Sequence, residues 1–259
     1  MTITRRTFVT GTTAGVLALA ASQAMAATGT NQPMVVLDPG HGGHDPGAIG
    51  ATGLYEKHIA LMVATRLKPV LETKLGCSVV LTRGDDDFLP LAERVRFAEQ
   101  HNAALFLSVH ADALTDRRVR GASVYTGAAS ASDAQTQKLA DRENSVDPAA
   151  NLGLDNVSPE VASILENLME RETKAFSSQV QGELIKSLGH HVKLLHNPQR
   201  HADFAVLRST AVPSALMEMA FMSNPADERL LNSTHYQDAI IGSVTDAVGR
   251  FIGRPVAVR

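Results

Sequence analysis

The sequence is poor in two residue types that often carry recognisable chemistry. Its 259 residues include one cysteine, Cys77, and no tryptophan. A single cysteine excludes an internal disulfide, a four-cysteine zinc site and CxxC redox chemistry. Any metal must therefore be held by histidine and carboxylate side chains.

Charge is also scarce and nearly balanced. Charged residues make up 20% of the chain, and the formal net charge is −3. Nucleic-acid binding usually leaves a basic stripe, and nothing in the overall charge points to one. With 44% hydrophobic residues, the chain is long and apolar enough for one domain with a substantial core.

The N-terminus has the three parts of an export signal in order. Arg5-Arg6 comes first, an apolar stretch follows over about residues 14–21, and Ala24-Met25-Ala26 is a small-residue cleavage site. The apolar stretch is shorter than the ~20 residues that span a bilayer. The alternative is a buried helix of the mature domain. The paired arginines resemble a twin-arginine signal. We predict a signal peptide over residues 1–26 and a polar linker over 27–33.

Short apolar runs alternate with segments of helical periodicity along the mature chain. The predicted strands cover residues 34–37, 79–81, 105–109, 122–125, 204–207 and 215–219. A helix is expected to begin at Glu56, and Pro69 should kink it or end it early. Alternating strands and helices imply a largely parallel sheet covered on both faces. The prediction is a single α/β domain over residues 34–254.

One segment of this domain has a different character. From about residue 128 to 190 the sequence is polar and helical, with no clear strand. Ser158 could cap a helix that has Pro159 at its first position. Val161, Ile164, Leu165 and Leu168 then form an apolar stripe. We interpret this segment as a helical insertion.

Three potential metal ligands lie beside predicted strand ends or at a helix start. His41 follows the first strand in a glycine-rich loop, Glu56 opens the first helix, and His110 follows the third strand. In open parallel sheets, sites form at the carboxyl ends of strands. Two histidines and one glutamate form a known catalytic zinc set that leaves a position for water. A single histidine is more often a plain surface or core residue, so the argument depends on the positions of these three together.

Glu218 is the candidate acid–base residue. It lies within the apolar run Leu216-Met217-Glu218-Met219-Ala220-Phe221. A carboxylate there is costly to bury unless it is paired or functional, although it could also face solvent from a strand edge. Beside a metal site it would act as general base and then as proton donor to the leaving amine.

Other polar residues are weaker candidates. His44 is a possible rival ligand in the loop of His41 and is interpreted as a loop residue. The adjacent pair His190-His191 would diverge by about 100° on a helix and makes a poor metal site. Asp38 could orient a ligand or stabilise a turn, and both roles stay open.

The chemically distinctive segments resemble the N-acetylmuramoyl-L-alanine amidases of the amidase-3 family. The resemblance covers Val36–Gly43, Glu56-Lys57, Ser108–Asp112 and Met217–Phe221, and it extends over nearly the whole mature chain. It implies hydrolysis of the amide between N-acetylmuramic acid and L-alanine in peptidoglycan. It also implies a twisted mixed sheet flanked by helices.

The resemblance further implies roles for individual residues. One zinc ion per chain would be held by His41, Glu56 and His110, and Glu218 would be catalytic. Periplasmic cell-separation amidases carry a matching insertion whose glutamate, in a Leu-Ala-x-Arg-Glu-Asn segment, occupies the open zinc position. Glu143 is the matching residue here. The resemblance also implies a periplasmic location and a LytM-type activator protein that docks on the insertion.

Two other functions are consistent with the residues themselves. A zinc exopeptidase could use a similar α/β scaffold, although such enzymes often need further carboxylate ligands for a second metal. A wall-binding module that has lost catalysis could keep the fold. Glu218 argues against that module, because nothing would then favour a carboxylate in so apolar a run.

Overall fold

The computed structural model describes residues 32–147 and 160–253, and of residues 160–168 it describes the backbone alone. The predicted signal peptide therefore lies outside the described residues. So do the predicted cap at Ser158-Pro159 and the side chains of the apolar stripe over residues 161–168. No described helix combines the length and apolar character needed to cross a membrane.

A mixed sheet forms the centre of the domain, as the alternation of strands and helices predicted. The described strands are β1 (Met34–Pro39), β2 (Ser78–Leu81), β3 (Leu105–His110), β4 (Ala122–Gly127), β5 (Leu194–Ala202) and β6 (Ser214–Glu218). Their order across the sheet is β2-β1-β3-β6-β4-β5. Strands β2, β1, β3 and β6 are parallel, whereas β4 pairs antiparallel to β6. The carboxyl ends of β1, β3 and β6 consequently meet at one edge of the sheet.

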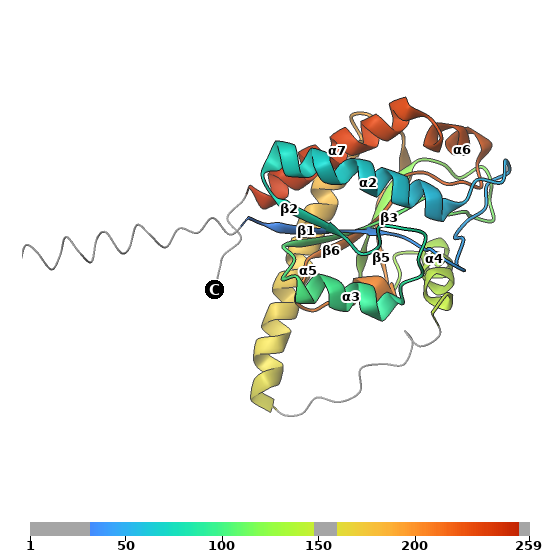
Figure 1. Ribbon diagram of the computed structural model, residues 1–259. Helices are drawn as coiled ribbons and strands as arrows, with labels where there is room; N and C mark the ends of the chain where they lie inside the picture. The colour runs from blue at the N-terminus through green and yellow to red at the C-terminus, as the bar shows by residue number, and fades with distance from the viewer. Residues whose placement is uncertain (1–31, 148–159, 254–259) are drawn as a thin grey trace, which may run out of the picture. The chain divides into compact units, whose positions relative to one another are not determined.

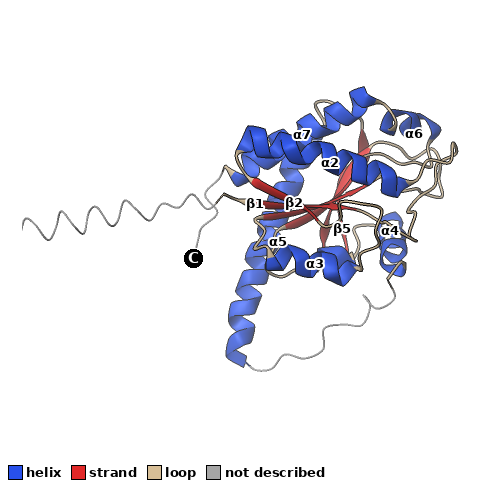
Figure 2. Ribbon diagram, in the orientation of Figure 1, coloured by secondary structure: helices blue, strands red, loops and turns tan. Residues whose placement is uncertain are grey.

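Helices cover both faces of this sheet (Figures 1 and 2). The described helices are α2 (Glu56–Leu75), α3 (Leu91–Gln100), α4 (Ala134–Ser145), α5 (Glu160–Leu188), α6 (Pro225–Leu231) and α7 (Thr234–Ile252), with a short 3-10 turn, η2 (Ala205–Leu207). Helices α2, α5 and α7 pack on one face over the larger apolar core, which includes Val35, Leu107 and Met217. The smaller core on the other face includes Phe106 and Leu139.

Helix α2 continues through Pro69 to Leu75, so the predicted early end is wrong. Proline inside a helix removes one backbone hydrogen bond and costs about 3 kcal/mol. The apolar face of α2, with Val63, Leu67 and Leu71 fully buried, packs against the sheet and keeps the helix intact. Tertiary packing usually contributes more to helix stability than local propensity does.

The predicted strand over residues 204–207 is also wrong. These residues form η2, and the strand lies earlier, as β5. Strand β5 is polar and contains Pro198, and it pairs with β4 alone, at the edge of the sheet. Edge strands tolerate polar residues and proline, so the apolar pattern that marks central strands is absent here.

The predicted helical insertion contains two different parts. Val180, Leu184 and Leu188 of α5 are fully buried in the larger core, so this half of α5 belongs to the basic fold. Helix α4 instead lies at the edge where β1, β3 and β6 end (Figure 1). The part that could be an insertion into the basic fold is therefore shorter than residues 128–190 and includes α4.

Candidate active site

His41 lies in the loop that follows β1, in an unusual backbone conformation. Its φ angle is +61°, in the left-handed region that L-residues rarely adopt. Arg94, from α3, donates through Nη2 to the His41 carbonyl oxygen at 2.8 Å. Arg83 donates to the carbonyls of Pro39 and Gly40 in the same loop. These two buried guanidinium groups hold the loop in a conformation that would otherwise be strained.

Asp38 stabilises this loop through Arg94. Its carboxylate accepts from Arg94 Nη1 at 2.8 Å, from Thr82 Oγ1 at 2.5 Å and from Ser108 Oγ at 2.7 Å. Burial alone would raise its pKa, but Arg94 and the two hydroxyls hold that pKa below its usual range. Asp38 makes no hydrogen bond to a histidine ring among the described contacts, so its role is structural.

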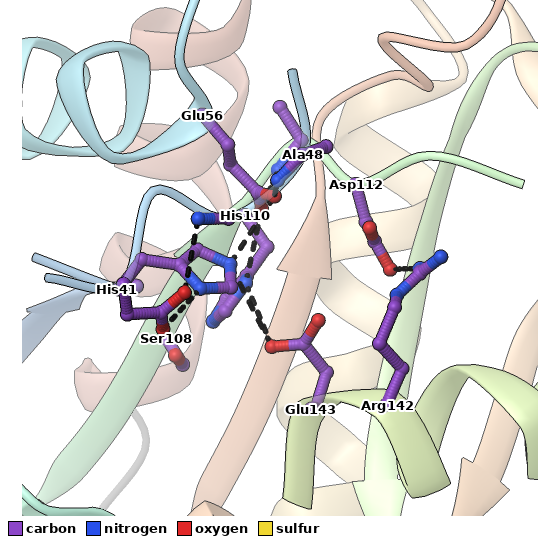
Figure 3. A network of polar contacts seen from close by, with 12 residues as sticks. His41, Ala48, Glu56, Ser108, His110, Asp112, Arg142 and Glu143 are labelled. Atoms are coloured by element: carbon purple, nitrogen blue, oxygen red, sulfur yellow. Dashed lines mark hydrogen bonds and ion pairs between the residues drawn. The ribbon is translucent and has the colours of Figure 1, made fainter. Parts of the chain in front are cut away.

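The Glu56 carboxylate contacts both predicted histidine ligands (Figure 3). Its Oε2 is 3.2 Å from His41 Nε2, and its Oε1 is 3.1 Å from His110 Nδ1. The backbone N–H groups of Ala48 and Ala111 each donate to one of these oxygens at 2.8 Å. Residues from β1, α2 and β3 that are far apart in sequence therefore converge on one point.

Two glycines make this close approach possible. A Cβ at Gly47 would lie 2.6 Å from His41 Cδ2 and 2.8 Å from Glu56 Oε2. A Cβ at Gly40 would overlap the His110 ring. Only glycine fits at these two positions without moving a predicted ligand.

Asp45 orients His41, although it was not among the site residues predicted from the sequence. Its Oδ2 lies 2.8 Å from His41 Nδ1, and its Oδ1 accepts from Gly47 N at 3.0 Å. A carboxylate on one ring nitrogen fixes the tautomer and directs the other nitrogen toward a metal. The available signal was an acidic residue four positions after His41 in the same short loop.

The surrounding carboxylates change the pKa values of the cluster. Burial would lower the pKa of His41, but Glu56, Glu143 and Asp45 raise it well above its usual value. The pKa of His110 is also raised, by Glu143 and Glu56, against the effect of burial. Burial would raise the pKa of Glu56, but the two histidines hold it well below its usual value. The carboxylates therefore favour protonated histidine rings. A metal cation bound in the cluster would supply the same positive charge.

The donor set fits a metal ion. His41, His110 and Glu143 each offer one ligand atom, and these atoms lie within 4.8 Å of one another. His41 Nε2 is buried and makes no hydrogen bond within the described part of the chain, although Glu56 Oε2 lies 3.2 Å away as a charged neighbour. A buried polar nitrogen without a hydrogen bond is costly unless a ligand occupies it. Imidazole nitrogens with carboxylate oxygens suit a divalent transition metal.

Glu218 ends β6 beside this cluster. It is the register partner of His110 on β3, and its side chain is fully buried. Its Oε2 accepts from Asp112 N at 2.8 Å, whereas Oε1 has no hydrogen bond with the described residues. Burial first, and then the negative charge of Glu56, raise the pKa of Glu218 well above its usual value. A carboxylate with a free oxygen and a raised pKa is suited to accept and return a proton.

Helix α4 covers the cluster from the side (Figure 3). Glu143 Oε2 lies 3.5 Å from His110 Nδ1 and 3.7 Å from His41 Nε2. The neighbouring Arg142 forms an ion pair with Asp112. Figure 3 shows the two side chains leaving the same helix toward different parts of the site.

His44, His190 and His191 lie apart from this cluster. His44 is exposed, and its ring packs on Phe88 with centroids 4.1 Å apart. His190 and His191 lie in the exposed turn after α5, with ring centroids 6.4 Å apart.

The fold and the site together define a class of α/β enzymes. In this class, histidines and carboxylates at the carboxyl ends of parallel strands can hold a metal ion beside a buried carboxylate. Such a site suits hydrolysis of an unactivated bond.

The chain belongs to the N-acetylmuramoyl-L-alanine amidase family, whose model matches residues 35–250. It is 37% identical over 216 residues to N-acetylmuramoyl-L-alanine amidase AmiA of Escherichia coli strain K12, covering 83% of this chain and 74% of that protein. It is 38% identical over 235 residues to AmiC of Neisseria meningitidis serogroup B, covering 88% and 55%. It is therefore an enzyme of this class, a peptidoglycan amidase.

Solved structures agree with this assignment. The catalytic domain of CwlV, an amidase from Bacillus (Paenibacillus) polymyxa var. colistinus, is 25% identical with a TM-score of 0.63. The match covers 86% of this chain and 99% of the CwlV domain. AmiC2 of Nostoc punctiforme is 28% identical with a TM-score of 0.62, covering 86% and 98%.

Proposed function

We propose that this amidase is zinc-dependent and that His41, Glu56 and His110 hold one zinc ion per chain. The observation that carries the proposal is the convergence of His41 Nε2 and His110 Nδ1 on the Glu56 carboxylate, at 3.2 and 3.1 Å. When bound there, zinc would activate water near neutral pH and polarise the scissile carbonyl. Three protein ligands leave a position for these reactants.

Glu218 is the proton carrier in this proposal. Its unbonded Oε1 accepts a proton from the attacking water and later donates it to the nitrogen of the leaving amine. The hydrogen bond from Asp112 N holds the other oxygen, so the carboxylate keeps one orientation. Its raised pKa makes Glu218 a stronger base toward the attacking water.

Digestion of purified sacculi tests the reaction. Mass spectrometry should find free stem peptides beside intact glycan chains, and a zinc chelator should abolish their release. Release of single amino acids would instead indicate a zinc exopeptidase. Binding to sacculi without any release, with zinc present and helix α4 displaced by mutation, would indicate a wall-binding module.

We further propose that α4 inhibits the enzyme. Glu143 Oε2 lies close to both predicted histidine ligands, where it would compete with water and substrate for the metal. Asn144 holds the end of the helix: its Nδ2 donates to Asp203 O at 2.7 Å, and its Oδ1 accepts from Ala205 N at 2.8 Å. These two hydrogen bonds disfavour spontaneous opening of α4, and a partner protein would displace the helix.

The cellular role follows from this regulation. A LytM-type activator protein that docks on the helical insertion would displace α4 at the division site. The amidase would then cut peptidoglycan between daughter cells. The twin-arginine pattern at Arg5-Arg6 would direct export to the periplasm. Replacing both arginines with lysine should keep a fused reporter in the cytoplasm, and periplasmic reporter activity would contradict this route.

A further inference from the structure

Asp112 is a buried carboxylate that lies beside the catalytic centre. It lies two residues after the end of β3 and is 1% exposed, and its main-chain N–H donates to Glu218 Oε2 at 2.8 Å. Its Oδ1 accepts from Ala113 N, and its Oδ2 pairs with Arg142. Asp112 therefore touches both the proton carrier and the covering helix.

The ion pair between Asp112 and Arg142 joins a buried side chain to one that is half exposed. The Asp112 side chain is 2% exposed, whereas the Arg142 side chain is 46% exposed. Arg142 also lines a cavity of about 280 Å³ between α4 and residues 114–116. The same cavity is lined by polar side chains, among them Asp116 and Lys138, and by the apolar side chains of Leu114 and Leu139. The Arg142 guanidinium thus reaches from a half-exposed position on α4 to a carboxylate that solvent scarcely touches.

Movement of α4 would leave Asp112 without a cation. Its ion pair with Arg142 is the only one that the described part of the chain provides. A buried carboxylate that loses its partner is strongly unfavourable unless another donor replaces it. When α4 is displaced, an N–H or ammonium group of a ligand could take the position that the Arg142 guanidinium leaves.

We propose that Asp112 binds the peptide side of the substrate and that Arg142 occupies this position while α4 covers the site. The inference rests on the proposed function, in which Glu218 protonates the leaving amine. Asp112 N contacts Glu218, and Glu218 would protonate the leaving amine, which belongs to the peptide. On this ground we place the peptide beside Asp112. Its ligand is an amide N–H or ammonium group of that peptide. Helix α4 then inhibits twice, through Glu143 at the metal and through Arg142 at the peptide site.

Steady-state kinetics of Asp112→Asn test the peptide-binding role. The variant is made together with Glu143→Ala and Arg142→Ala, which remove both inhibitory contacts, so that losing the Asp112 charge cannot raise activity by releasing α4. It is compared with the Glu143→Ala, Arg142→Ala parent on a soluble muramoyl-peptide. Asparagine keeps the main-chain N–H to Glu218 and the shape of the side chain but loses the charge. The expected result is a KM raised by about 10–100-fold, the loss typical of a charged hydrogen-bond partner, with kcat within about threefold and zinc content unchanged.

Asp141→Asn is the matched control, because Asp141 is an exposed acid next to Arg142 that accepts from Gln137 on the same helix. It should leave KM and kcat unchanged. A fall in kcat at constant KM for Asp112→Asn would overturn the proposal, because Asp112 would then only position Glu218. An unchanged KM and kcat would overturn it as well.

Arg142→Ala, with Glu143 intact, tests the covering role. It should raise activity without a partner, by less than Glu143→Ala does, because the metal contact stays. No increase would overturn the second inhibitory contact. The outcomes also separate this inference from the proposed function: absence of hydrolysis by every variant contradicts the function, whereas hydrolysis with an unaltered KM in Asp112→Asn contradicts only the inference.

Discussion

His110 and Glu218 are register partners on the parallel strands β3 and β6, although they are far apart in sequence. Both side chains leave the same face of the sheet where the two strands end. This pairing puts a predicted metal ligand beside a predicted proton carrier on rigid elements of the core. Strand pairing therefore sets the distance between them more precisely than a loop could.

Removal of His41 should remove the metal. The His41→Ala variant leaves two protein ligands, and we expect zinc affinity to fall by more than about 100-fold, beyond the range for residues that only orient a ligand. Zinc content after dialysis, measured by mass spectrometry, checks this. His44→Ala is the control, because His44 is exposed in the same loop and should keep its zinc. Stoichiometric zinc and full activity in His41→Ala would show the assignment to be wrong.

Asp45 should affect zinc affinity without being a ligand. Asp45→Asn weakens the interaction with His41 Nδ1, which is 2.8 Å long in the parent. Loss of a carboxylate that orients a ligating histidine typically costs 10–100-fold in metal affinity, so we expect a loss of about that size. Competition with a chromogenic chelator measures it. An affinity equal to that of the parent would mean that backbone geometry alone orients the ring.

Glu218→Gln should keep zinc and lose activity. The amide has nearly the same shape but cannot take up the proton, and general acid–base groups typically contribute about 10²–10⁴-fold. Turnover of a soluble muramoyl-peptide is compared in the Glu143→Ala background. Glu93→Gln, at an exposed position on α3, should have no effect. An active Glu218→Gln enzyme would exclude this residue from the mechanism.

Glu143→Ala should raise activity in the absence of any partner. The substitution removes the carboxylate that lies 3.5 Å from His110 Nδ1 and 3.7 Å from His41 Nε2. Asp141→Ala, on the exposed face of α4, should stay at the parent level. Deleting residues 135–175 would be a poorer test, because it also removes Thr173. Thr173 is buried and its Oγ1 donates to Thr210 O, so the deletion would disturb the fold as well as α4. If a folded, zinc-loaded Glu143→Ala digests sacculi no faster than the parent, α4 does not inhibit.

Arg94→Ala should destabilise the fold by about 3–5 kcal/mol, because it leaves Asp38 buried without its cation. Urea unfolding at several pH values measures this loss.

The loss should also depend on pH. In the parent, the lowered pKa of Asp38 stabilises the fold above about pH 4, which is the pKa of an aspartate in the unfolded chain. This contribution is lost as pH falls further. In the variant, burial raises that pKa, so the Asp38 contribution turns unfavourable as pH rises. The stability difference should therefore grow between pH 4 and pH 7. A constant difference would show that the ion pair is not its cause.

The sequence by itself determined the elements whose signal is local. The runs before His41, His110 and Glu218 are apolar and end in polar or small residues, which is typical of buried parallel strands leading to a site. Motif resemblance then identified the family. The polar edge strand β5 has no such run, because a strand paired on one side does not need two apolar faces.

Tertiary structure decided everything that depends on contact between distant segments. Asp45 and Arg94 are ordinary polar residues in sequence, and only the fold gives them His41 and Asp38 as partners. Helix α2 continues through Pro69 because its buried face outweighs a local preference. The pairing of Arg142 with Asp112 joins two exposed-looking charges from separate elements. The hydrophobic periodicity of a sequence predicts which face of a helix or strand a residue occupies. Which other side chain that residue contacts depends on how the helices and strands pack together.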